Sequence, residues 1–248
     1  MPHYYKITLE YDGTLYHGWQ KQSHGSTIQT SIENALSRLA QQTVNVIGAG
    51  RTDAGVHALG QVANFELNRA ILPATLLRGL NALLPCDIAT KEVKEVDAHF
   101  HARYGAQCKT YHYFIYNAQT RSPWQRQTAW HLRGQLDLQK MQQAAKSLMG
   151  RHDFTSFCAA ENDAKNHIVD LYEIAIVKKE AHISITLTAN RFLRYMVRNI
   201  VGLLVEIGRG KKDANTINMI LEGKDRRLAG ITAPPHGLFL MEVRYIEN

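Results

Sequence analysis

The sequence predicts an α+β protein whose strands are mostly antiparallel, and two observations carry this prediction. Segments in which apolar and polar residues alternate, as in strands, are separated by segments whose apolar residues recur at helical spacing. Residues 1–104 follow the order β-α-β-β-α-β, and residues 105–248 repeat that order with additions. Split β-α-β motifs of this kind build antiparallel sheets with helices on one face. We therefore expect two α+β units, although no linker rich in Pro, Gly or Ser marks the boundary between them.

The elements of the first half are predicted in chain order. Residues 3–10 alternate and are rich in Tyr, Ile and Thr, so a strand is expected there. Ser26 and Gln29 have the spacing of a capping box, and apolar residues at helical spacing follow them. Pro73 begins a second helix and Pro85 ends it, because proline suits only the first turn of a helix. The remaining strands of this half are expected at residues 43–48, 60–66 and 87–96.

The second half is expected to contain four strands and three helices. Its most distinctive strand is aromatic-rich, and one face of it presents Tyr111 together with Lys109, Tyr113 and Ile115. The strands are predicted at residues 106–117, 168–178, 182–189 and 238–245. The helices are predicted at residues 138–149, from about 191 to 207, and from near Asp213 onward.

Composition and charge limit the class of partner. Lys and Arg number 29 against 22 Asp and Glu, which gives a net charge of +7 and favours a polyanionic partner such as nucleic acid. The positive charge is spread along the chain, which is typical of a folded basic surface rather than a disordered arm. Binding that depends on such a surface is expected to weaken as the salt concentration rises.

The sequence also indicates the cellular compartment in which the protein is expected. No apolar run approaches the roughly 18 residues of a membrane span, and the start MPHYYKITLE has no signal-peptide pattern. The three cysteines lie far apart without a Cys-x-x-Cys pair, which argues against a disulfide framework and against structural zinc. We therefore expect buried thiols, a cytoplasmic location and no membrane association.

The stretch GAGRTDAGVHA is the candidate site. It places three glycines beside Arg51, Asp53 and His57, between two predicted strands. It is not a dinucleotide fingerprint, because Asp53 stands where a third glycine would be needed, and no P-loop pattern follows. From these residues alone, Asp53 could simply hydrogen-bond its own turn, and His57 could be a structural or a surface histidine.

Residues Gly50–Ala58 resemble the signature of the TruA family of tRNA pseudouridine synthases, whose aspartate is catalytic. Further resemblances follow the order of the family across nearly the whole chain, which a chance likeness of one loop would not produce. They comprise Tyr4–Trp19, Lys109–Tyr113, Gly150–Phe157, Phe192–Arg198 and Thr232–Leu238.

The resemblance implies a fold, a reaction and partners. The implied fold is two ferredoxin-like units that form an extended, mostly antiparallel sheet with helices on one face and a central cleft. The implied reaction is the isomerisation of uridine to pseudouridine at positions 38, 39 and 40 of the tRNA anticodon stem-loop, catalysed by a homodimer. The rearrangement needs no cofactor and no metal, and no cofactor motif is present in the sequence.

The resemblance also implies the roles of four side chains. Asp53 is expected to be the nucleophile or base, and Tyr111 is expected to stack on the target uracil. Arg198 is expected to pair with Asp53, because an enclosed carboxylate is costly to ionise without a nearby cation. Arg51 is expected to contact RNA and assist base flipping. The first unit would then carry the catalytic loop, and the second unit would carry the stacking tyrosine and the supporting arginine.

Two further arginines lie close to Arg198 in the sequence. Arg191, Arg194 and Arg198 are spaced to share one face of the predicted helix over residues 191–207. We interpret Arg191 and Arg194 as a solvated basic stripe.

Two other functions are consistent with parts of the sequence. A metal-dependent hydrolase could use His99 and His101, which would share one face if they lay on a strand, but no second cluster accompanies them. A non-catalytic RNA-binding module is the better alternative, because ferredoxin-like sheets with exposed aromatics bind RNA. Its usual RNP1 pattern is missing, and a pure binding protein offers no reason for the Asp53 loop.

Overall fold

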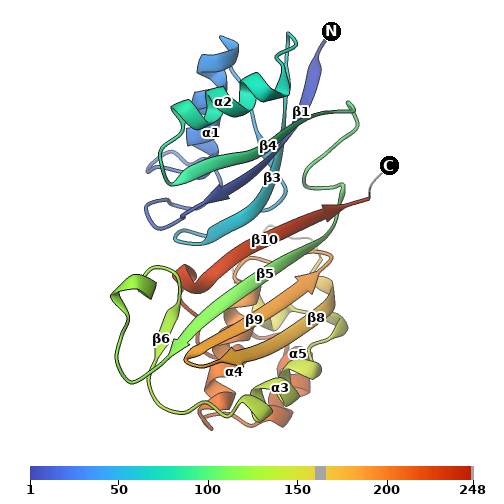
Figure 1. The fold of residues 1–248 in the computed structure, drawn as a ribbon. Helices are drawn as coiled ribbons and strands as arrows, with labels where there is room; N and C mark the ends of the chain where they lie inside the picture. Colours follow the sequence, from blue (N-terminus) through green and yellow to red (C-terminus); the bar gives the residue numbers. More distant parts are fainter. Residues whose placement is uncertain (160–165, 247–248) are drawn as a thin grey trace. The chain divides into compact units, whose positions relative to one another are not determined.

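The structure is a computed structural model that describes residues 1–159 and 166–246, and these residues form two compact units (Figure 1). The first unit contains Met1–Gln107 and Phe239–Asn248, and the second contains Cys108–Leu238. The chain thus leaves the first unit near the expected boundary and returns to it at the C-terminus.

The first unit has the β-α-β-β-α-β order, followed much later in the chain by a C-terminal strand. Both helices lie where the apolar periodicity predicts them, whereas the strand expected at residues 43–48 is reduced to two residues. The elements are β1 (His3–Tyr11), α1 (Ile28–Ala40), β2 (Ile47–Gly48), β3 (His57–Leu67), α2 (Pro73–Leu83), β4 (Ile88–Val96) and β10 (Leu238–Tyr245).

The sheet of the first unit is built around β1 and β3. Strand β1 pairs antiparallel with β3 on one side and with β4 on the other. Strand β2 pairs antiparallel with β3. Strand β10 pairs with β3 in parallel, with Phe239 opposite His57. Helices α1 and α2 contact each other (Figure 1), and their apolar residues Ile32, Leu36 and Leu80 are fully buried.

Helix α1 begins with a different cap from the one predicted. Its N-cap is Thr27, whose hydroxyl accepts a hydrogen bond from the Thr30 N–H at 3.2 Å. The predicted capping box of Ser26 and Gln29 is wrong, because the N-cap is one residue later than Ser26 and the Gln29 side-chain amide donates to the Glu33 carboxylate at 3.0 Å.

The second unit contains mostly antiparallel strands and three helices. Its elements are β5 (Ala106–Asn117), β6 (Trp130–Leu132), α3 (Leu138–Lys146), β7 (Gly150–Asp153), β8 (Ile168–Lys179), β9 (His182–Ala189), α4 (Met196–Gly208) and α5 (Ile217–Gly223). The strand order is β5-β9-β8-β7 with antiparallel pairing, and β6 pairs with β5 in parallel. Both units therefore confirm the predicted α+β class.

Helix α4 starts later than predicted. It begins at Met196 rather than near residue 191, because Tyr195 has a φ of 67°, in the left-handed region, and cannot continue a right-handed helix. From Val201 to Val205 the helix is buried on every side and supplies much of the core of the second unit.

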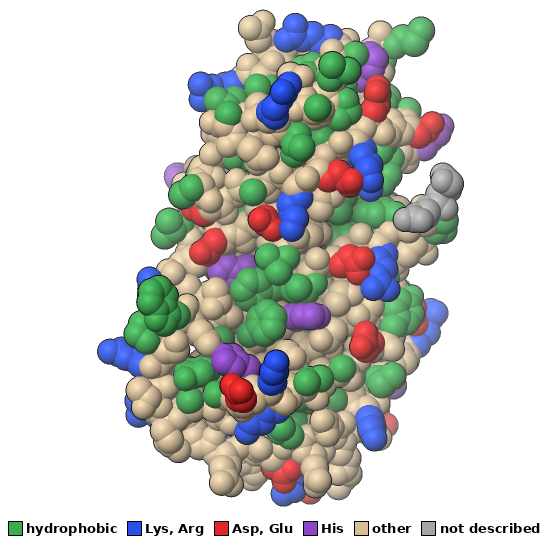
Figure 2. Space-filling model, viewed as in Figure 1, with side chains coloured by type: hydrophobic (Ala, Val, Ile, Leu, Met, Phe, Trp, Pro, Cys, Tyr) green, Lys and Arg blue, Asp and Glu red, His purple; other side chains and the backbone are tan. Residues whose placement is uncertain are grey.

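Surface charge is mixed on the face shown in Figure 2. Lys and Arg side chains are scattered there among Asp and Glu side chains rather than gathered in one patch. This distribution agrees with the even spread of positive charge along the chain. None of the helices in the described parts of the chain is long and apolar enough to span a membrane.

Candidate active site

The Asp53 loop connects β2 to β3 and is shaped by a tight turn. The carbonyl oxygen of Asp53 accepts a hydrogen bond from the Val56 N–H at 3.1 Å. Gly55 has a φ of 75°, which the third residue of a type II turn requires and which glycine adopts without strain. The Asp53 side chain is half-buried, whereas Arg51 is exposed and its Nε donates to Oε1 of Gln20 at 3.0 Å. The loop is therefore a defined turn that carries both Asp53 and Arg51, the two site residues predicted in this part of the chain.

The segment from Tyr11 to Trp19 holds this loop in place. The Trp19 N–H donates to the Thr52 carbonyl at 3.0 Å, and the Gly55 N–H donates to the Tyr16 carbonyl at 3.3 Å. The hydroxyls of Tyr11 and Thr52 lie 2.8 Å apart in a buried position. Burial raises the pKa of Tyr11 to about 12, despite the hydrogen bonds of its hydroxyl, so this group stays protonated at neutral pH.

Gly18 permits the close approach of these two segments. A Cβ at Gly18 would lie 2.5 Å from the carbonyl oxygen of Thr52, and Gly18 also has a φ of 88°. The obstructing atom belongs to the backbone, so it cannot rotate aside as a side chain would. The stretches Tyr4–Trp19 and Gly50–Ala58, which both carry the family resemblance, therefore contact each other next to Asp53. The sequence alone did not indicate this contact.

His57 is a structural residue at the start of β3. It is 2% exposed and stacks on Phe239 with ring centroids 4.5 Å apart. Its Nδ1 accepts a hydrogen bond from the Gly13 N–H at 3.1 Å and lies 3.1 Å from Oδ1 of Asp12. Burial raises the pKa of the Asp12 carboxyl, but hydrogen bonds from Thr14 and the neighbouring His57 outweigh burial and hold the pKa below its usual value. Of the two interpretations left open for His57, the structural one is correct.

Tyr111 lies in the middle of β5, opposite Leu187 of β9. Its side chain is 6% exposed, and its ring meets Phe192 edge to face with centroids 5.0 Å apart. This contact joins two stretches that carry the family resemblance, and it fixes the orientation of the Tyr111 ring.

Arg198 lies in the first turn of α4 and is half-buried. Its Nε donates to the Ala233 carbonyl at 2.8 Å, and the Ala233 N–H donates to the Arg198 carbonyl at 3.0 Å. The guanidinium also lies 4.9 Å from the centre of the Tyr195 ring, a favourable cation–π arrangement. The structure thus holds the Arg198 side chain from two directions.

Asn199 is a residue of this region that sequence reasoning missed. It is fully buried, and its Nδ2 donates to the Phe157 carbonyl at 2.7 Å. Its Oδ1 accepts hydrogen bonds from Arg226 at 2.8 Å and from the Thr232 hydroxyl at 2.7 Å. Two stretches of the resemblance, Gly150–Phe157 and Thr232–Leu238, thus meet at this amide, directly after Arg198. The available signal was an asparagine at the start of the apolar run that forms most of this helix.

The predicted arginine stripe is wrong. Arg191 and Arg194 precede α4, so they do not share a helix face with Arg198. Arg191 instead donates to the Asn166 carbonyl at 2.7 Å, and the Arg194 guanidinium lies 5.0 Å from the centre of the Tyr195 ring.

The histidine pair of the hydrolase alternative does not lie on a strand. Strand β4 ends at Val96, and residues 97–105 form turns in which the Gly105 N–H donates to the His101 carbonyl at 2.9 Å. The shared face expected for His99 and His101 is therefore wrong. Within residues 1–159 and 166–246, no group of three His, Cys, Asp or Glu side chains is placed to hold a metal ion.

The predicted site residues are divided between the two units. Asp53 and Arg51 belong to the first unit, whereas Tyr111 and Arg198 belong to the second. The ion pair between Asp53 and Arg198 joins different units and stays a prediction.

Comparison with known families gives a match over most of the chain. A family model described as tRNA pseudouridine synthase matches residues 7–105 and 144–246. The matched residues include Asp53 and Arg198, whereas Tyr111 lies in the unmatched stretch between the two ranges.

Full-length relatives extend this match. A protein named tRNA pseudouridine synthase A from Acetivibrio thermocellus is 45% identical, covering 97% of this chain and 98% of its own length. A protein of the same name from Shewanella piezotolerans is 43% identical, covering 98% of this chain and 93% of its own length. Among solved structures, a chain of the archaeal box H/ACA sRNP Nop10-Cbf5 complex matches with a TM-score of 0.35 and 12% identity. That match covers 81% of this chain and 43% of the other, and it is too weak to inform the fold.

Proposed function

This chain belongs to the tRNA pseudouridine synthase family, and we propose that it converts uridine to pseudouridine at positions 38, 39 and 40 of the tRNA anticodon stem-loop. The observation that carries the proposal is the Asp53 loop, which lies within the matched residues and is held by backbone hydrogen bonds to the segment from Tyr11 to Trp19. A catalytic carboxylate needs such a fixed position, because small displacements of a reacting group reduce the rate steeply.

The proposed reaction is an isomerisation. The bond between N1 of uracil and C1′ of ribose breaks, a bond between C5 and C1′ forms, and a proton leaves C5 while N1 gains one. No oxidant, reductant or group donor is consumed, so the reaction requires no cofactor. Asp53 acts as the nucleophile or base at the extruded nucleotide. Arg51, exposed on the same loop, contacts the RNA and assists base flipping.

The second unit supplies the supporting groups in this proposal. Tyr111 stacks on the target uracil, a role supported by the edge-on contact with Phe192 that fixes its ring. Arg198 pairs with Asp53 and offsets the cost of desolvating its carboxylate. The hydrogen bonds between Arg198 and Ala233 support this role, because they hold the guanidinium in one position. The first unit then carries the catalytic loop and the second carries the stacking and pairing side chains.

The enzyme is further proposed to act in the cytoplasm as a homodimer. Sedimentation equilibrium is expected to give a mass of about twice the 28.1 kDa of one chain. A mass of one chain at all concentrations used for activity would contradict the dimer.

The test of the proposed function is turnover of an unmodified tRNA transcript by the purified protein in the presence of EDTA. Pseudouridine mapped to positions 38, 39 and 40 by chemical labelling and primer extension is the expected result. Tight binding of the transcript without any pseudouridine would instead favour the non-catalytic RNA-binding module. Activity that EDTA abolishes would contradict a metal-free reaction.

A further inference from the structure

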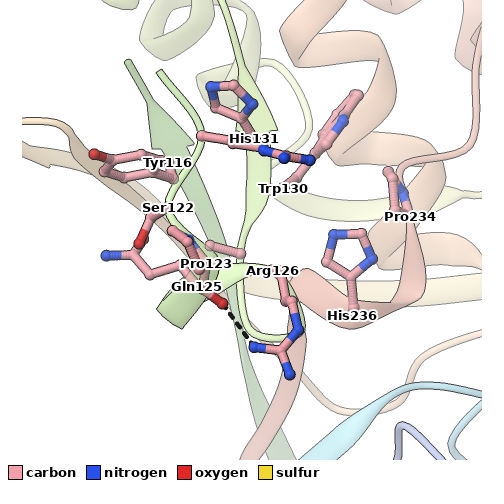
Figure 3. A pocket seen from close by; sticks show the side chains of 11 residues that line it. Tyr116, Ser122, Pro123, Gln125, Arg126, Trp130, His131, Pro234 and His236 are labelled. Atoms are coloured by element: carbon pink, nitrogen blue, oxygen red, sulfur yellow. Dashed lines mark hydrogen bonds between the residues drawn. The ribbon is translucent and has the colours of Figure 1, made fainter. Parts of the chain in front are cut away.

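The second unit contains a cavity of about 590 Å³ that the proposed reaction does not use (Figure 3). This volume lies in the range of small-ligand sites. Most of its wall comes from residues 116–131, which lie outside the ranges that the family model matches. The lining includes Tyr116, Arg121, Arg126, Trp130, His131 and His236.

The aromatic side of the cavity follows from strand pairing. Strand β6 runs parallel to the end of β5, so Tyr116 lies opposite His131, and Ile115 lies opposite Trp130. The rings of Tyr116 and His131 have centroids 5.9 Å apart and an interplanar angle of 36°. Figure 3 shows Tyr116, Trp130 and His131 around the cavity. Such faces stack on nucleobases in a sequence-tolerant way.

Two of the residues that line the cavity are cationic. Arg121 and Arg126 are exposed, and Arg126 is anchored by a hydrogen bond from its Nη1 to the Pro123 carbonyl at 2.8 Å. None of the described lining residues is acidic, and the sequence has no Asp or Glu between Asp97 and Asp137. Aromatic faces beside unopposed arginines are the arrangement expected for an unpaired base and its flanking phosphates.

A large exposed aromatic residue adjoins this site. Trp124 lies in the short 3-10 turn Pro123–Gln125 and is 91% exposed. Exposing a whole indole to water is unfavourable, so its position between Arg121 and Arg126 in sequence indicates a contact surface.

We propose that this cavity binds an unstacked base of the tRNA, other than the uridine that reacts, and that Arg121 and Arg126 contact the adjoining phosphates. This proposal rests on the proposed function, because it takes tRNA as the ligand. A second copy of the chain fits the charge less well, since a partner surface would need carboxylates and the chain carries 29 Lys and Arg against 22 Asp and Glu.

The test compares two double variants with equal loss of charge. Arg121→Gln/Arg126→Gln removes both cations and keeps an amide that can donate to the Pro123 carbonyl. Arg38→Gln/Arg209→Gln removes two exposed arginines that do not line the cavity. Binding of an unmodified tRNA transcript is measured by fluorescence anisotropy at several salt concentrations. The cavity variant is expected to bind about tenfold more weakly than the control, with a salt slope smaller by about two.

A second pair of variants tests stacking. Tyr116→Phe keeps the ring face, whereas Tyr116→Leu removes it, so only Tyr116→Leu is expected to weaken tRNA binding, by about tenfold. Melting temperatures of all variants identify any loss of folding.

Each outcome separates this proposal from the proposed function. Equal affinities and salt slopes for the two arginine double variants, together with equal affinities for Tyr116→Leu and Tyr116→Phe, would overturn the cavity site even if the wild type makes pseudouridine. A specific loss of affinity in the cavity variants would support the site even if the wild type makes none. A change in self-association without a change in tRNA affinity would show that the cavity binds a second copy, and would also overturn the proposal.

Discussion

Asp53→Asn is expected to reduce the rate of pseudouridine formation by about a thousandfold or more, while tRNA binding changes by less than about threefold. An amide has the size of the carboxylate but is neither a nucleophile nor a base at neutral pH. The turn that holds this residue uses the Asp53 carbonyl and the Val56 N–H, and the substitution leaves both unchanged. Single-turnover rates with excess enzyme on an unmodified transcript, together with anisotropy measurements of binding, test both halves of the expectation.

Asp137→Asn provides the matched control. Asp137 caps α3, where its side chain accepts a hydrogen bond from the Lys140 N–H at 3.0 Å, and asparagine caps helices equally well. The control is expected to turn over like the wild type. An Asp53→Asn variant as fast as this control would remove Asp53 from the mechanism.

Gly18→Ala is expected to destabilise the protein by about 3 kcal/mol and to reduce turnover by about a hundredfold. The alanine would carry a φ of 88° and would place its Cβ 2.5 Å from the Thr52 carbonyl oxygen. Relief of this clash must move the residue next to Asp53. Chemical denaturation gives the change in the free energy of unfolding, and the single-turnover assay gives the loss of rate.

Gly134→Ala separates the steric effect from the strain of the backbone. Gly134 has a φ of 82°, close to that of Gly18, but a Cβ there would meet no atom within 4 Å. We expect a cost of about 1 kcal/mol and an unchanged rate per folded molecule. If the two variants lost equal stability and turned over equally fast, the contact between Gly18 and Thr52 would have no part in positioning Asp53.

Local patterns predicted the long strands well but missed the short strands β6 and β7. The strand expected at residues 106–117 is β5, and the strand expected at residues 238–245 is β10, with the same bounds. Alternation of side chains is a property of the strand itself, so a short window of sequence contains the signal. The pairing partner of β10 was not predictable, because its contact with β3 depends on residues nearly two hundred positions earlier in the chain.

Helix boundaries show where local patterns were insufficient. Apolar residues continue upstream of α4 through Phe192 and Leu193, so periodicity alone placed the start too early. In the structure the Arg194 carbonyl accepts a hydrogen bond from the Ala159 N–H at 3.0 Å, and Tyr195 adopts a left-handed conformation. The helix thus begins just after a hydrogen bond from a distant segment, a contact that apolar periodicity does not reveal.

By itself, the sequence determined the α+β class, the family and the Asp53 loop as the candidate site, because element periodicity and motif order are written along the chain. Only the tertiary structure decided what supports these residues. Gly18 and Tyr11 hold the Asp53 loop, and Asn199 ties three distant stretches together beside Arg198. These contacts satisfy buried polar groups and bring together the backbones of segments far apart in the chain. No local pattern in the sequence encodes such contacts.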